Sequence, residues 1–128
     1  MTVNEQNNTP VKTILAALDN GSYDAEASVD ELEELAKTAN AEVVARVIQK
    51  RPSADSATVL GEGKIEEIAE LAENLGAELL VFDTELTASE IRNIEDVVNI
   101  RVIDRTMLIL DIFAGRAKAL TFLFNLNQ

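Results

Sequence analysis

Hydrophobic and polar positions follow two periods along this chain, and the change from one period to the other predicts strands and helices in turn. Four short apolar runs have the length of β-strands, at 11–18, 42–49, 78–82 and 100–103. Apolar residues recur at helical spacing in the segments that begin at Ser28, after Gly61–Lys64, at Thr87 and at Arg105. The pattern therefore predicts a strand followed by a helix, four times over.

Local signals set the expected ends of the helices. Ser28 with Glu31, and Thr87 with Glu90, have the spacing of a capping box, so we expect helices to start at Ser28 and Thr87. Gly76 stands where a helix commonly ends in a left-handed residue. The last helix, predicted over 105–117, is apolar nearly all round, which predicts burial on more than one side.

This alternation is typical of an α/β fold with a mostly parallel sheet of about four strands and helices on both faces. The strands are continuous apolar runs, as expected where both faces of a sheet are covered. We expect a disordered lead over 1–10, the α/β domain over 11–118 and an apolar tail over 119–128.

The length and composition of the chain exclude several classes of function. A chain of 128 residues fits one domain, and it contains no cysteine and no histidine. It therefore lacks the commonest general base and the commonest metal ligands, and no catalytic or metal-binding group of residues is evident. We expect a non-enzymatic protein, cytoplasmic by default, because we find neither a secretory signal nor a membrane span.

The charge excludes a uniformly basic nucleic-acid binder. Lys and Arg number 11 against 23 Asp and Glu, a net charge of −12. Two segments, 43–64 and 101–128, nevertheless each hold four basic and two acidic residues. If they meet in space they would form a modest basic face suited to RNA. Solvated surface charges without a partner are the alternative.

A glycine-containing turn, Gly61-Glu62-Gly63-Lys64, precedes the second helix. It is not a phosphate loop, because Thr58 replaces the first glycine and Ile65 the hydroxyl residue of that motif. A turn at a helix N-terminus could still receive an anion. The alternative is a plain loop-to-helix transition, which the neighbouring glutamates favour.

Parallel sheets bind ligands at the carboxyl ends of their strands. The candidate RNA or ligand contacts are the residues at these strand ends together with those of the glycine turn: Lys50, Arg51, Gly61, Gly63, Lys64, Asp83, Asp104 and Arg105.

Several segments together resemble one known family. They are 32–44, 61–67, 81–87, 91–95 and, most specifically, Val102-Ile103-Asp104-Arg105-Thr106 with 108–114 and 116–117. In this order, from about Val11 to Lys118, the chain is similar to the N-terminal domain of HflX-type GTPases. The resemblance implies a non-catalytic α/β domain of a family that associates with the large ribosomal subunit and its RNA.

The same resemblance implies that GTP and Mg²⁺ belong to a later domain of the family, so no cofactor is expected in this chain. Gly61–Lys64 and Asp104–Thr106 would correspond to family segments that define the fold or make contacts. Two other functions stay open: a small-ligand or nucleotide-binding domain, and a self-associating fragment with no activity of its own.

The tail departs from the family, which typically continues into a charged helix and a helical hairpin. Here Leu120, Phe122, Phe124 and Leu126 alternate at strand spacing. The tail could add an edge strand, extend the last helix or form a homodimer contact. We expect a truncated member that lacks the hairpin and the GTPase domain.

Overall fold

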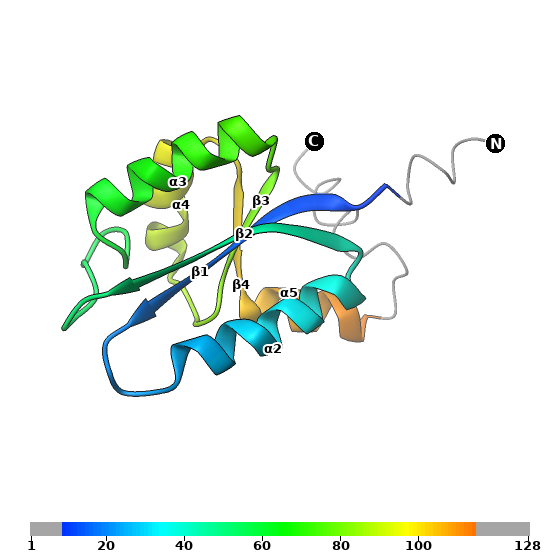
Figure 1. The fold of residues 1–128 in the computed structure, drawn as a ribbon, viewed down its shortest axis with the longest axis horizontal. Helices are drawn as coiled ribbons and strands as arrows, with labels where there is room; N and C mark the ends of the chain where they lie inside the picture. Colours follow the sequence, from blue (N-terminus) through cyan, green and yellow to red (C-terminus); the bar gives the residue numbers. More distant parts are fainter. Residues whose placement is uncertain (1–8, 115–128) are drawn as a thin grey trace.

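The computed structural model describes residues 9–114. Strands and helices alternate as predicted (Figure 1): β1 (Val11–Asp19), α2 (Ala25–Thr38), β2 (Ala41–Lys50), α3 (Glu62–Leu75), β3 (Leu79–Phe82), α4 (Ala88–Val98), β4 (Arg101–Asp104) and α5 (Arg105–Phe113). The α/β class is confirmed. Nearly all of the expected lead and all of the expected tail lie outside the described residues.

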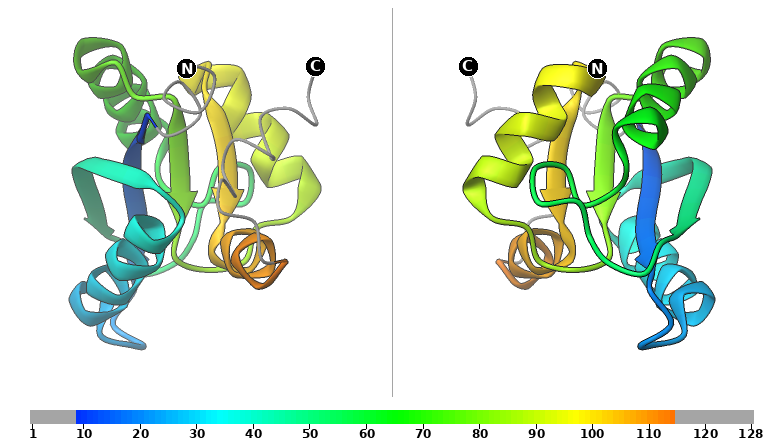
Figure 2. Two further views of the ribbon diagram at one scale, coloured as in Figure 1. Left: turned by 90° about the vertical axis from the view of Figure 1, so that its right-hand side faces the viewer. Right: turned by 90° about the vertical axis from the view of Figure 1, so that its left-hand side faces the viewer.

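The four strands form one parallel sheet in the order β2-β1-β3-β4. All four arrows accordingly point the same way in Figure 2. β1 pairs with β2 along its whole length and with β3 from Thr13 to Ala16. β1, the first strand among residues 9–114, is therefore an interior strand of the sheet.

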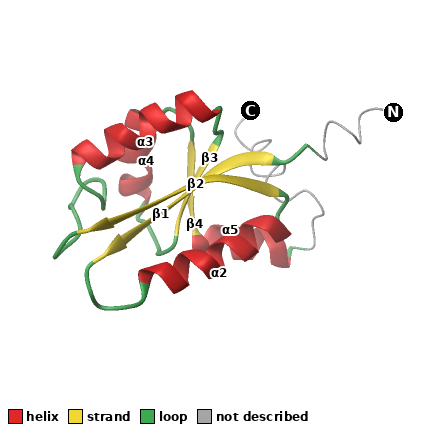
Figure 3. Ribbon diagram, viewed as in Figure 1, coloured by secondary structure: helices red, strands yellow, loops and turns green. Residues whose placement is uncertain are grey.

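Helices cover both faces, α2 and α5 on one and α3 and α4 on the other (Figures 1 and 3). Successive side chains of β1 explain why both faces are apolar. Leu15 and Ala17 pack on the side of α2 and α5, whereas Ile14 and Ala16 pack on the side of α3 and α4. The sheet is therefore buried between two helical layers.

The helix ends confirm two of the three local predictions. Thr87 and Glu90 form the capping box of α4, and Gly76 ends α3 with φ 70°. The predicted start at Ser28 is wrong, because Asp24 caps α2 by accepting a hydrogen bond from the Ala27 amide. Aspartate is as good an N-cap as serine, and it comes first along the chain.

The predicted burial of the last helix on more than one side is also wrong. Leu108 is buried, but Leu110 is 62% exposed and Phe113 is 80% exposed. α5 packs on α2 and the sheet with one side only. The predicted residues 115–117 of this helix lie outside the described part. Within residues 9–114, no helix combines the length and hydropathy needed to cross a membrane.

Candidate functional site

The carboxyl edge of the sheet is the place where this topology assembles a site. After β1 the chain turns to α2 on one face, and after β3 it turns to α4 on the other. The chain therefore leaves the neighbouring strands β1 and β3 toward opposite faces of the sheet. The gap between two such connections is the position where open parallel sheets bind ligands. Asp83 follows β3 directly at this point.

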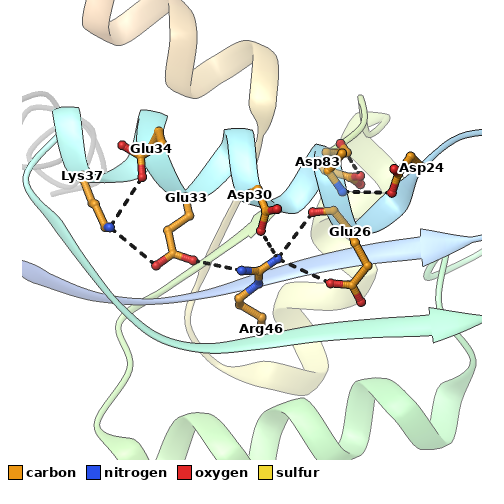
Figure 4. Close-up of polar contacts among 10 residues, drawn as sticks. Asp24, Glu26, Asp30, Glu33, Glu34, Lys37, Arg46 and Asp83 are labelled. Carbon is orange, nitrogen blue, oxygen red and sulfur yellow. Dashed lines mark hydrogen bonds and ion pairs between the residues drawn. The ribbon is translucent and has the colours of Figure 1, made fainter.

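Hydrogen bonds to the Asp83 side chain connect the end of β3 to the loop after β1 and to the start of α2. Its side chain is buried, and Oδ2 accepts hydrogen bonds from the Tyr23 hydroxyl at 2.6 Å and from Ser28 Oγ at 2.8 Å. Its other oxygen, Oδ1, is buried without a hydrogen-bond partner among the described residues. Figure 4 shows Asp83 beside the first turn of α2. Asp83 is among the residues predicted from the sequence, but neither of its hydroxyl partners is.

The surroundings of Tyr23 change the pKa of its hydroxyl group. Burial raises the pKa of the Tyr23 phenol above its ordinary value, and the hydrogen bond to Asp83 and the Asp83 charge raise it further. The hydroxyl also lies 3.1 Å from the Leu18 carbonyl at the end of β1. Tyr23 therefore remains a neutral donor and links the ends of β1 and β3.

Lys50 and Arg51 lie at the end of β2, on the edge of a surface hollow of about 460 Å³. Asp19, Asn20, Gly21 and Pro52 complete its lining. The Arg51 amide donates to the Asp19 carbonyl at 3.1 Å, which joins the hollow to β1. Arg51 Nη1 is buried and has no hydrogen-bond partner among residues 9–114.

The loop after β2 holds a strained residue. Val59 has φ 67°, a conformation that a β-branched residue rarely adopts, and it is buried. The Leu60 amide donates to the Thr58 carbonyl across it at 2.6 Å. Asp55 Oδ1 accepts from the Ala57 and Thr58 amides, and these bonds lower the Asp55 pKa, with smaller contributions from the Thr58 hydroxyl and the Arg51 charge.

The glycine turn lies near the same edge but its polar groups are already engaged. The Gly61 amide donates to Gln49 Oε1 at 2.9 Å, and Lys64 Nζ lies 3.0 Å from Glu67 Oε1. Gly61 has φ −61°, and open space surrounds the Cβ position of Gly63. Neither glycine is required by a positive φ or by a close contact, so nothing in the structure explains them.

Asp104 and Arg105 hold elements together. Asp104 caps α5 through the Met107 amide at 2.9 Å, and its second oxygen accepts from the Leu86 amide at 2.9 Å. Arg105 Nη2 pairs with Glu31 Oε1 at 3.0 Å, joining α5 to α2. Both carboxylate oxygens of Asp104 and the Arg105 guanidinium therefore have protein partners.

The two basic segments do not gather into one face within residues 9–114. β2 and β4 are opposite edges of the sheet. Arg46 of β2 is surrounded by Glu26, Asp30 and Glu33 of α2, with its shortest contact 2.8 Å to Asp30 (Figure 4). Arg101 similarly lies 3.8 Å from Glu95. Acidic neighbours thus offset most of the local positive charge that the sequence suggested.

The candidate residues therefore separate into two groups. Asp83, Asp104, Arg105 and Lys64 are engaged with other described side chains or amides. Lys50 and Arg51 are adjacent cations that have no carboxylate within ion-pair distance in the described part of the chain. No cluster of three or more acidic side chains in residues 9–114 could hold a metal ion.

Comparison with known proteins agrees with this architecture. Residues 26–114 match the family model described as "GTP-binding GTPase N-terminal". The chain is 51% identical over 94 residues to the GTPase HflX of Alkalihalophilus pseudofirmus, covering 73% of this chain and 22% of the relative. The GTPase HflX of Lacrimispora saccharolytica is 50% identical over 107 residues, 83% of this chain and 25% of the relative.

A more distant relative gives the same result. The GTPase HflX of Escherichia coli (strain K12) is 41% identical over 90 residues, 70% of this chain and 21% of the relative. The chain thus spans about a quarter of the length of the curated relatives it matches. Since the family model covers more than half of the chain, the protein belongs to the GTP-binding GTPase N-terminal family, and its sequence is that of an HflX N-terminal domain.

Proposed function

We propose that this domain is a non-catalytic module that contacts RNA of the large ribosomal subunit through Lys50 and Arg51. The observation that carries the proposal is the pair of adjacent cations at the carboxyl edge, free of ion pairs among residues 9–114. The resemblance to a ribosome-associated family supports the choice of partner.

The state of the other cations favours this position. Lys37, Arg46, Lys64, Arg101 and Arg105 each have a carboxylate partner, and among residues 9–114 only Lys12 and Arg92 share with Lys50 and Arg51 the lack of an ion pair. An RNA phosphate would have to displace that partner, whereas at Lys50 and Arg51 no ion pair with a described residue has to be broken. The unpartnered Arg51 Nη1 keeps donor capacity that a phosphate oxygen could use after a small side-chain movement.

The charge of the whole chain limits the kind of contact. A net charge of −12 repels RNA at long range, so binding must come from a local contact rather than from a broad basic surface. A contact of two cations releases few counterions, and its salt dependence should be correspondingly shallow. The proposed contact of Lys50 and Arg51 with RNA would therefore help to position the domain within a larger assembly.

We do not place the GTPase activity of the relatives in this chain. The chain has no histidine or cysteine, and its buried carboxylates Asp83 and Asp104 accept hydrogen bonds within the fold. Relatives of this chain are named GTPases, and the chain matches only about a quarter of their length. GTP binding and hydrolysis are accordingly proposed for the part of those relatives that this chain does not match.

Cosedimentation with purified large ribosomal subunits at low and moderate salt tests the proposal. We expect the chain in the ribosomal pellet and Lys50→Glu to reduce the bound fraction, with a salt slope lower by about one for each phosphate interaction that the substitution removes. Arg51→Gln should act in the same direction; its melting temperature is measured alongside, because Arg51 is partly buried.

Lys12→Glu is the matched control. Lys12 is exposed and has no ion pair among the described residues, but it lies at the beginning of β1, at the opposite edge of the sheet. Its reversal changes the net charge equally and should leave the bound fraction nearly unchanged. Equal losses for Lys12→Glu and Lys50→Glu, or no wild-type protein in the pellet at either salt concentration, would reject the contact.

A further inference from the structure

The loop that follows β1 contains Asn20-Gly21, the only asparagine–glycine pair in the sequence. Asparagine is among the chemically labile residues of proteins. Asn20, Gly21 and Ser22 are exposed, and Gly21 has φ 86°, a conformation that favours glycine. Because glycine has no side chain to shield its amide nitrogen, this nitrogen can approach the side-chain carbon Cγ of the asparagine before it.

The side-chain oxygen of Asn20 already accepts hydrogen bonds from Ser22. Asn20 Oδ1 lies 3.0 Å from the Ser22 amide nitrogen and 2.6 Å from Ser22 Oγ. When a nucleophile attacks Asn20 Cγ, negative charge develops on this oxygen. Donors that are in place before the attack stabilise such a charge, as they do in an oxyanion hole. Ser22 thus supplies groups that favour attack at Asn20 Cγ.

The nitrogen that would attack is in contact with a base. The Gly21 amide donates to Asp19 Oδ1 at 3.1 Å, within the distance expected of a general base and the proton that it accepts. Asp19 can therefore take the amide proton while the Gly21 nitrogen forms its new bond. Segment 19–22 thus holds the base, the nucleophile, the electrophilic carbon and the oxyanion donors of one reaction.

We propose that Asn20 is a site of deamidation that its own loop promotes. The Gly21 nitrogen bonds to Asn20 Cγ while its proton passes to Asp19 Oδ1. The bond between Cγ and Nδ2 then breaks, and Nδ2 leaves as ammonia with the proton that Asp19 returns. The cyclic imide that remains is opened by solvent water at either carbonyl, which yields aspartate or isoaspartate at position 20.

The product changes the charge of the surface hollow at the carboxyl edge. Asn20 lines this hollow together with Lys50 and Arg51. A carboxylate at position 20 adds a negative charge beside two cations that have no ion pair among residues 9–114. It would therefore compete with an RNA phosphate for them. This consequence, unlike the modification itself, rests on the proposed function.

Peptide mass mapping tests the modification directly. The tryptic peptide 13–37 contains Asn20 and no other asparagine or glutamine, so a gain in its mass reports replacement of the Asn20 amino group by a hydroxyl. We expect this gain in folded protein that is incubated at neutral pH. Peptide 93–101, in which each asparagine precedes a branched isoleucine, is the internal control and should keep its mass.

Three variants separate the contribution of the fold from the intrinsic reactivity of the pair. Ser22→Ala removes the hydroxyl donor and Asp19→Ala removes the base, so each should slow the reaction severalfold in the folded protein. Asp96→Ala removes an exposed acid in the last turn of α4 and should leave the rate unchanged. In urea, where the hydrogen bonds of the loop are lost, all four proteins should react at the same rate.

The proposal is overturned if peptide 13–37 keeps its mass in the folded wild-type protein while the urea-unfolded chain gains mass. It is equally overturned if folded Ser22→Ala and Asp19→Ala, verified by circular dichroism, both react as fast as the wild-type protein.

Cosedimentation with large ribosomal subunits tests the consequence for RNA. Asn20→Asp carries the charge of the product, and Asn20→Gln is its neutral control. We expect less Asn20→Asp than Asn20→Gln in the ribosomal pellet. Equal bound fractions would overturn the effect on RNA, and a wild-type protein missing from the pellet would overturn the proposed function, whereas the mass gain is measured without ribosomes.

Discussion

At the scale of single residues, Asp83 is the most informative side chain at the carboxyl edge. Its Oδ2 atom accepts two hydrogen bonds, one from the Tyr23 hydroxyl in the loop after β1 and one from the Ser28 hydroxyl in the first turn of α2. Burial of a carboxylate is costly unless it accepts hydrogen bonds, so these two bonds offset much of its desolvation. The result is a fixed loop conformation beside the diverging ends of β1 and β3.

Tyr23 is the only tyrosine, so absorbance titration of the chain reports on this residue alone. We predict a Tyr23 pKa above the ordinary value near 10, because burial and Asp83 both disfavour the phenolate. The folded-state pKa is raised, so the stability that Tyr23 contributes is complete below about pH 10 and declines as the pH rises above it.

Asp83→Asn provides the comparison. It removes the carboxylate charge but retains an acceptor oxygen, so the Tyr23 pKa should fall part of the way toward its ordinary value. Ser22→Ala, in the same loop but with its hydroxyl bonded to Asn20, should leave the titration unchanged. A wild-type Tyr23 that titrates like free tyrosine would contradict the hydrogen bond to Asp83.

Part of this site could be predicted from the sequence. Asp83, Lys50 and Arg51 were predictable because residues that follow apolar strands collect at one edge of a parallel sheet. Tyr23 and Ser28 were not, because their contacts with Asp83 join residues far apart in the chain and no spacing signals them. The strain at Val59 was equally hidden, since valine gives no sign of a positive φ.

At the scale of elements, the ends of the helices show where local patterns are sufficient. The Thr87–Glu90 pair had no competing cap and was predicted correctly. Ser28 and Asp24 competed for the start of α2, and the serine spacing predicted the later start although Asp24 lies nearer the turn. For α5, composition indicated an apolar helix but not which of its sides a neighbour covers.

Asp24→Ala should destabilise the domain by about 1 kcal/mol, because the Ala27 amide at the start of α2 loses its acceptor. Urea denaturation followed by circular dichroism measures the change. Asp96→Ala is the matched control, since Asp96 is an exposed acid in the last turn of α4. Its removal should have no destabilising effect, because a negative charge is unfavourable at a helix C-terminus.

A stability loss for Asp96→Ala as large as that for Asp24→Ala would point to general charge effects rather than to capping. No loss for Asp24→Ala would leave Ser28 as the better candidate for the functional start of α2.

At the scale of the whole molecule, an acidic surface surrounds a sheet whose buried side chains are mostly apolar. The net charge of −12 is the excess of carboxylates that remains when every cation is counted, and most ion pairs among residues 9–114 involve an acidic side chain of α2. Exposed ion pairs contribute little to stability, whereas repulsion among the excess carboxylates acts over the whole surface. Screening should therefore stabilise the fold.

We predict that the melting temperature rises as sodium chloride increases from low ionic strength to about 0.15 M, where the screening length is about 8 Å. Differential scanning calorimetry at pH 7 measures it. Repeating the scan at pH 5, where more carboxylates are protonated, should give a smaller salt effect. A melting temperature that falls with added salt would mean that attractive ion pairs outweigh the repulsion.

The interior position of β1 has a consequence for how the chain is made. β1 is synthesised before the other three described strands, and β2 can pair with one of its edges as soon as α2 and β2 are complete. Its other edge must wait for β3, whose Leu79 pairs with Thr13. Until then an apolar strand edge of the nascent chain is open to other strands, as aggregation-prone edges are. Translation through residues 79–82 is therefore the step that protects the growing polypeptide.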